Sequence, residues 1–289
     1  MGNLGKLAVA ALLITGTSVV AQSASAQKAK APARAAAPAT IGGHPNINGV
    51  WQTMSGADFG LEPHSAQTAP AAQSERELGA IAAIPAGLGV VEGGEIPYLP
   101  ETKATRDANA KAGPMKDPEA NCYLPGIPRA TYALGMPFQI IQGGGDILMA
   151  YEYASANRVI QMGDIGIPPI DTWMGTSYGR WEGNTLVVTT LSQNGETWLD
   201  RAGNFVAPTT TVIEKFTQMG PNHIDYSVTF EDPELYTKPW TINMPLYRRM
   251  EKNAQLLEFK CVPFAEMYLY GDLYDTMDAE AKKRLGIEN

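Results

Sequence analysis

Residues 222–231 read Asn-His-Ile-Asp-Tyr-Ser-Val-Thr-Phe-Glu, in which apolar and polar side chains alternate. Successive side chains of an extended chain point to opposite faces, so the apolar members share one face and the polar members share the other. The apolar members are Ile224, Tyr226, Val228 and Phe230. This stretch therefore predicts a β-strand with one packed face and one face in water.

Similar segments surround this strand, and turn sequences such as Gly143-Gly144-Gly145-Asp146 and Glu182-Gly183-Asn184 separate them. The predicted strands are 137–142, 146–153, 157–162, 185–192, 209–218, 222–231, 239–248 and 255–261. Strands at this spacing without intervening helices indicate a mainly β protein. We expect an antiparallel up-and-down barrel or a strongly curled sheet.

The predicted barrel domain covers residues 44–270 and includes an irregular Pro/Gly-rich wrap at 52–136. Short helices are expected near 74–83 and 101–111, and a polar helix at 271–289.

The N-terminus has the order of regions found in secretory signal peptides. Lys6 precedes an apolar run, and small residues precede a cleavage position after Ala26. We expect a signal peptide at 1–26, a disordered Ala/Pro linker at 27–43, and a periplasmic or secreted protein; the alternative is an uncleaved anchor. No later segment is long and apolar enough to predict a membrane span.

The formal net charge is −8, which argues against nucleic acid and anionic lipid as partners, because both attract clustered Lys and Arg. The three histidines lack metal-ligand spacing, and no nucleotide-binding motif is present. We expect no metal and no cofactor.

Cys122 and Cys261 are the two cysteines. In an exported chain they favour a disulfide, which a chain-entropy model credits with roughly 4–5 kcal/mol. Two buried thiols or a catalytic cysteine are the alternatives.

Asn48-Gly49-Val50-Trp51 resembles the Gly-x-Trp of the first strand in lipocalin-like barrels, where the indole plugs the closed end; Trp51 could equally be a core aromatic. Further blocks resemble a large, mostly uncharacterised family of exported bacterial proteins. These blocks are DPEANC at 117–122, TWMGTSYGRWEGNTLVV at 172–188, TWLDRAG at 197–203 and EDPELYTKPW at 231–240. The resemblance implies a calycin-like barrel but no common activity.

The chain departs from that family at positions where a pocket is expected. Many relatives have His in place of Thr176 and of Thr211, and Asp in place of Asn184. The resemblance therefore implies that any chemistry of those histidines is altered here.

Glu214 is the leading candidate for catalysis, because strand parity places it on an apolar face with Val212 and Phe216. Burial would raise its pKa, or an arginine such as Arg180 or Arg201 would keep it ionised. We predict Glu214, Arg180 and Tyr236 as catalytic residues. The alternative is a buried ion pair that holds the barrel closed.

The candidate ligand-binding residues are Trp173, Thr176, Trp198, Asp200, Arg201, Thr211 and Trp240. Core packing is the alternative for the tryptophans, and a hydrogen-bonded turn is the alternative for Asp200-Arg201. Two functions fit: a cofactor-independent lyase or isomerase acting on a small aromatic or phenolic compound, or a non-catalytic carrier of an apolar ligand. A structural envelope protein is a third possibility.

Overall fold

The computed structural model describes residues 40–66, 84–112, 116–163, 166, 168–263, 279 and 283. The predicted signal peptide, most of the linker, the predicted helix at 74–83 and nearly all of the predicted C-terminal helix lie outside these residues. At the end of the expected linker, β1 (Thr40–Ile41) and β2 (His44–Pro45) form a two-stranded hairpin.

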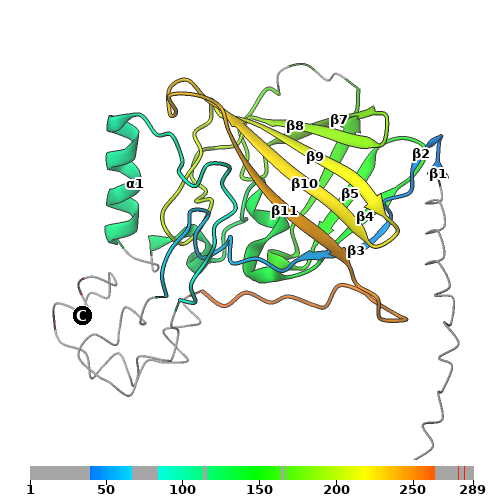
Figure 1. The fold of residues 1–289 in the computed structure, drawn as a ribbon, viewed down its shortest axis with the longest axis horizontal. Coiled ribbons are helices and arrows are strands. Elements are labelled where there is room, and N and C mark those ends of the chain that lie inside the picture. Colours follow the sequence, from blue (N-terminus) through cyan, green and yellow to red (C-terminus); the bar gives the residue numbers. More distant parts are fainter. Residues whose placement is uncertain are drawn as a thin grey trace, which may run out of the picture. The chain divides into compact units, whose positions relative to one another are not determined.

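Within the described residues, strands β3 to β11 close into a barrel, and the mainly β prediction is confirmed (Figure 1). The strands are β3 (Gly49–Thr53), β4 (Phe138–Gln142), β5 (Ile147–Tyr151), β6 (Asn157–Met162), β7 (Thr176–Glu182), β8 (Thr185–Leu191), β9 (Thr211–Gly220), β10 (His223–Glu231) and β11 (Trp240–Arg248). Each strand pairs with its sequence neighbours, and β11 pairs with β3 to complete the ring.

The expected antiparallel up-and-down order is wrong at one place, because β6 and β7 are parallel. A closed ring with an odd number of strands cannot alternate direction throughout, so one parallel pair is required. Gly179 of β7 fits here because a Cβ at this position would lie 2.7 Å from Ile160 on β6. The segment 255–261, predicted as a strand, forms none.

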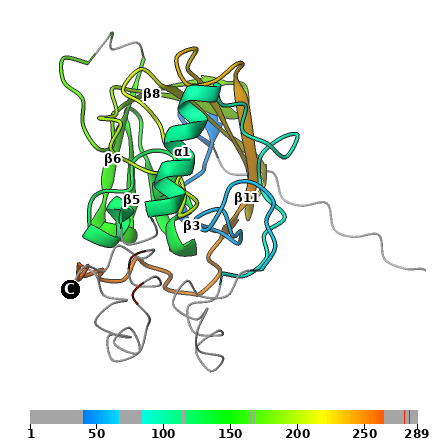
Figure 2. The ribbon, with the colours of Figure 1, turned by 90° about the vertical axis from the view of Figure 1, so that its left-hand side faces the viewer.

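The helix expected at 101–111 is present as α1 (Pro100–Ala112), with Glu101 in its first turn and Lys111 in its last, as the helix dipole favours. It lies outside the barrel wall and buries no residue (Figure 2). Short 3₁₀ turns with bounds inside the described residues are η3 (Pro118–Asn121), η4 (Arg129–Thr131), η5 (Ala133–Gly135) and η6 (Tyr153–Ser155).

Trp51 belongs to the core, with no exposed surface, and its indole donates to the Ile47 carbonyl at 2.9 Å. The Arg248 guanidinium lies over its ring at 4.2 Å. Gly49 makes this contact possible, because its φ of +142° suits glycine and any Cβ would lie 1.9 Å from Arg248 Nη1. The Gly-x-Trp motif thus joins the first and last barrel strands.

The predicted disulfide is confirmed: Cys122 and Cys261 are bonded, with their Cα atoms 5.7 Å apart. Among the described residues, no helix combines the length and the apolar character needed to cross a membrane.

Candidate functional site

Glu214 lies inside the barrel and is completely buried, as the strand parity predicted. Its partner is Arg158 of β6: Arg158 Nη1 donates to Oε2 at 2.6 Å, and Nη2 donates to Oε1 at 3.0 Å. This is a two-pronged guanidinium–carboxylate pair, the strongest geometry available to these groups.

Neighbouring side chains make further hydrogen bonds to Glu214 and Arg158. The Tyr226 hydroxyl donates to Glu214 Oε1 at 2.7 Å, and Arg158 Nη1 also reaches Ser177 Oγ at 3.2 Å. Burial lowers the pKa of Arg158, but the charge and hydrogen bonds of Glu214, together with the nearby Tyr151 and Tyr226, outweigh this effect and raise it. Burial and the same carboxylate raise the pKa of Tyr226. The cluster is therefore electrically neutral and closed to water.

A second buried arginine, Arg129 of η4, binds three carboxylates. Its Nε donates to Asp58 at 2.8 Å, its Nη1 and Nη2 each donate to Asp117 at 2.8 Å, and Nη2 also donates to Glu119. Arg201 binds Glu119 from the other side, at 3.2 Å. Formally, these residues carry one more negative than positive charge.

The electrostatics of this Arg129 cluster differ from one carboxyl group to another. Burial raises the pKa of Asp58, and the nearby Glu119 adds to the rise against the pull of Arg129. For Glu119, burial acts upward, but Arg129 and Arg201 together hold the pKa below its usual value. Asp58 therefore takes up a proton more readily than Glu119 does.

The DPEANC block acquires a structural role from this cluster. Asp117 caps η3 by accepting from the Glu119 backbone N–H at 3.0 Å, and both carboxylates bind Arg129. Cys122, which follows the turn with φ of 65°, carries the disulfide. One short segment thus binds the buried arginine and, through the disulfide, anchors the chain that follows β11.

Asp200 is buried in a turn, as the Asp-Arg-Ala-Gly sequence favoured. It accepts from the Leu61 N–H at 2.8 Å, from the Asn204 N–H at 3.0 Å and from Asn204 Nδ2 at 2.7 Å. Burial raises its pKa to about 6. These contacts join the wrap to the loop that precedes β9.

Arg180 does not lie beside Glu214, where we expected it. Ser177 and Gly179 face the barrel interior, so Arg180 projects outward, with 58% of its side chain exposed, and binds Glu182 at 2.7 Å. Arg201 is also elsewhere, at Glu119. The same parity argument that selected Glu214 selects Arg158, which shares the inward face of β6 with Ile160.

The predicted aromatic residues do not form one cavity. Trp173 stacks on Tyr123 at 4.6 Å, whereas Trp240 stacks on Phe230 at 4.1 Å. Tyr236 is buried and donates to the Phe205 carbonyl at 3.1 Å. The Trp198 carbonyl accepts from Arg129 Nη1 at 3.4 Å.

Three of the predicted ligand-binding residues lie at the same end of the barrel. Thr176 begins β7, Thr211 begins β9 and Trp240 begins β11. Because β8 and β10 run antiparallel between these strands, the three starting points share one rim of the barrel.

A cleft of about 370 Å³ opens at this rim, beside Trp240. Its lining residues are Glu92, Gly93, Glu95, Ile96, Pro97, Lys238, Pro239, Trp240 and Thr241. The loop that forms one wall is fixed to β11, since the Glu92 N–H donates to the Thr241 carbonyl and the Asn243 N–H to the Val90 carbonyl, both at 2.9 Å. The cleft is thus a built feature that combines apolar walls with charged side chains.

In the described part of the chain, no group of three His, Cys, Asp or Glu side chains is arranged to hold a metal ion. Comparison with protein-family models, curated proteins and solved structures gives no match. The family resemblance therefore stays a prediction.

Proposed function

We propose that this chain is an exported protein that binds a small aromatic or apolar molecule in the Trp240 cleft without changing it chemically. The observation that carries the proposal is the cleft itself, an open hollow of about 370 Å³ at the barrel rim beside Trp240, where β11 begins. Its volume suits a ligand with one ring and a short side group.

The barrel interior supports a carrier better than the lyase that the sequence also allowed. Acid–base catalysis needs a group within hydrogen-bond reach of the substrate. Glu214 has no exposed surface, and both of its oxygens accept bonds from Arg158. A substrate would have to separate a buried ion pair to reach it, at a cost of several kcal/mol.

The charges around the cleft predict which ligands it prefers. Glu92 and Glu95 oppose a single lysine, Lys238, and all three side chains are exposed. Glu92 Oε1 accepts a hydrogen bond from Asn243 Nδ2 at 2.9 Å, so Glu95 is the less constrained of the two carboxylates. We expect an aromatic amine to bind more tightly than its carboxylate analogue.

The test is a fluorescence titration with phenethylamine, phenol and phenylacetate, with product analysis of each mixture after long incubation. We expect phenethylamine to bind most tightly, Glu95→Gln to weaken it about 3- to 10-fold, and Glu234→Gln, on the neighbouring loop outside the cleft, to leave it unchanged. If the Trp240 indole gives the fluorescence change on binding, Trp240→Phe removes that change.

The carrier proposal fails if a product forms and Glu214→Gln abolishes its formation in a folded protein. It also fails if none of the three probes binds and mass spectrometry of the natively purified protein shows no retained small molecule.

A further inference from the structure

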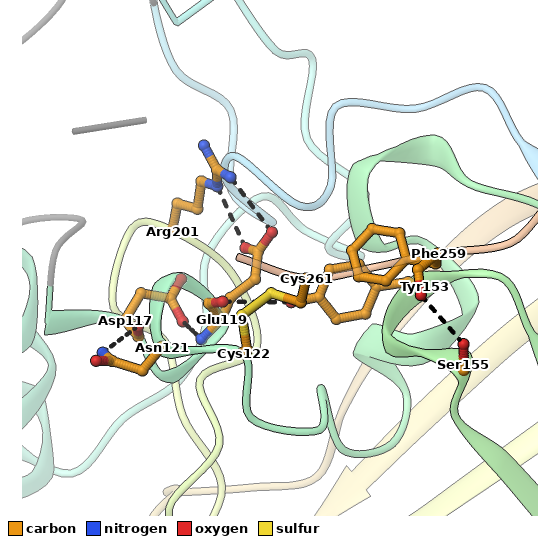
Figure 3. The surroundings of a disulfide bond; sticks show 9 residues. All are labelled: Asp117, Glu119, Asn121, Cys122, Tyr153, Ser155, Arg201, Phe259 and Cys261. Carbon is orange, nitrogen blue, oxygen red and sulfur yellow. Dashed lines mark hydrogen bonds and ion pairs between the residues drawn. A yellow bond between two sulfur atoms is a disulfide. The ribbon is translucent and has the colours of Figure 1, made fainter. Parts of the chain in front are cut away.

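Residues 252–263 cross the surface as an extended segment after β11, and few contacts hold it. The Leu257 N–H donates to Glu152 Oε2 at 2.7 Å, and the Phe259 ring packs on Tyr153 at 5.1 Å. Ser155 Oγ approaches the Phe259 carbonyl only at 3.5 Å. The strongest attachment is the covalent one, from Cys261 to Cys122 (Figure 3).

The packing of this segment is loose. Leu257 and Val262 are 67% and 51% exposed, and Leu256 and Phe259 are only half-buried, so its apolar residues hold it down only in part. A hollow of about 230 Å³ lies between its first half and the body of the protein, lined by Glu152, Arg249, Glu251, Asn253, Ala254, Gln255 and Leu257.

We propose that residues 252–263 form a strap which the Cys122–Cys261 disulfide latches over the Tyr153 surface, and that a dithiol reductant releases it. Beneath the strap lie the Tyr153 ring, the Glu152 carboxylate and, next to Cys122, Glu119 with its partner Arg201. Release uncovers an aromatic face beside an ion pair.

The chemistry of release needs an accessible disulfide, and both cysteines are only half-buried. A thiolate of the dithiol attacks one sulfur, forms a mixed disulfide and expels the other cysteine as a thiolate, which takes up a proton. The second thiol of the reductant then closes its own disulfide and frees the first cysteine. The protein gains two electrons and two protons, and the dithiol loses them.

The strap proposal predicts an unusually small effect of reduction on folding. In the unfolded protein the disulfide closes a loop spanning 139 positions, which costs conformational entropy. In the folded protein with a free strap, it closes only the roughly 13 residues between Arg248 and Cys261, which costs less entropy. If reduction frees the strap, the folded-to-unfolded ratio falls only about 35-fold, the three-halves power of the ratio of loop lengths. If the strap stays docked by itself, the fall is several thousand-fold.

The experiment compares native protein with and without dithiothreitol, and with Cys261→Ser, by limited trypsin digestion and by urea unfolding. We expect cleavage after Lys252 and Lys260 to accelerate at least 10-fold on reduction, with cleavage after Lys215 in β9 unchanged. Glu152→Ala in the oxidised protein removes the main hydrogen bond of the strap and is expected to change cleavage less than 3-fold.

Unchanged strap cleavage on reduction overturns the proposal, because the strap is then held by its own contacts. Equal acceleration at Lys215 also overturns it, since the disulfide then supports the whole barrel. If Cys261→Ser does not fold, the comparison of oxidised with reduced wild-type protein decides the outcome.

Discussion

Arg129 and Arg158, the arginines buried in the part of the chain that the structure describes, have their charges neutralised in different ways. Arg158 sits among strands, meets one carboxylate, Glu214, and leaves no net charge. Arg129 sits among 3₁₀ turns and loops, meets Asp58, Asp117 and Glu119, and needs Arg201 to offset part of the excess. The Arg158–Glu214 pair therefore carries no net charge, whereas the Arg129 cluster keeps a surplus negative charge and remains sensitive to protonation at Asp58.

The largest expected effect is at the Arg129 cluster. Arg129→Met leaves three carboxylates buried beside one another, and we expect it to lower the free energy of unfolding by about 4 kcal/mol or more, or to prevent folding. Arg201→Met, which changes a partly exposed arginine, is the matched control and is expected to cost about 1 kcal/mol. Urea unfolding measures both. Similar small losses for the two variants would show that the carboxylates do not depend on Arg129.

The next largest effect is at the barrel pair. Arg158→Met and Glu214→Gln should each cost about 3–5 kcal/mol, because each leaves its partner buried and unpaired. The double variant should cost much less than the sum, since no charge then remains inside. A double-mutant cycle by urea unfolding measures the coupling, and additive costs would contradict the pairing.

A smaller effect concerns pH, and it arises at Asp200. Burial raises its pKa to about 6 from an ordinary 3.8, so the folded state holds this proton more tightly than the unfolded state does. Its stabilising contribution is complete below about pH 4 and is lost as the pH rises through 6, by about 3 kcal/mol at most.

Asp200→Asn should remove this dependence while keeping a carbonyl oxygen to accept from Leu61. The free energy of unfolding, measured from pH 4 to pH 7, should fall with rising pH more in the wild type than in this variant. Parallel pH curves for the two proteins would show that Asp200 titrates normally.

The smallest effect is expected at Arg180. Its ion pair with Glu182 is exposed, so Arg180→Ala should change the free energy of unfolding by less than about 0.5 kcal/mol and leave ligand binding intact. Loss of binding in this variant would instead restore Arg180 as a functional residue and would move the proposed site away from the cleft.

The alternation of apolar and polar residues predicted some strands of the barrel and missed others. Alternation placed β9, β10 and β11 correctly and put Glu214 inside, because the period of two acts within a single strand. It missed β7 as a strand because Thr-Ser-Tyr-Gly-Arg-Trp-Glu has no apolar alternation. It predicted a strand at 255–261 that has no partner, because the closed barrel offers no free edge in the described residues.

The candidate site was less predictable than the strands. The identity of the partner of Glu214 depends on which inward residues of distant strands meet, and β6 and β9 are separated by two strands of the ring. Asp58, Asp117 and Glu119 come from loops without a period, so no pattern marks them as neighbours of Arg129. The Trp240 cleft forms because residues 90–92 pair with β11.

The sequence by itself determined the strand parity, the inward position of Glu214, the helix at α1 and the two cysteines available for a disulfide, since these depend on local spacing and residue chemistry. Only the tertiary structure decided the parallel β6–β7 pair, the choice of Arg158 over Arg180, the three-carboxylate shell of Arg129 and the open cleft. The physical reason is that ring closure and long-range register bring together residues whose separation in sequence carries no information about their separation in space.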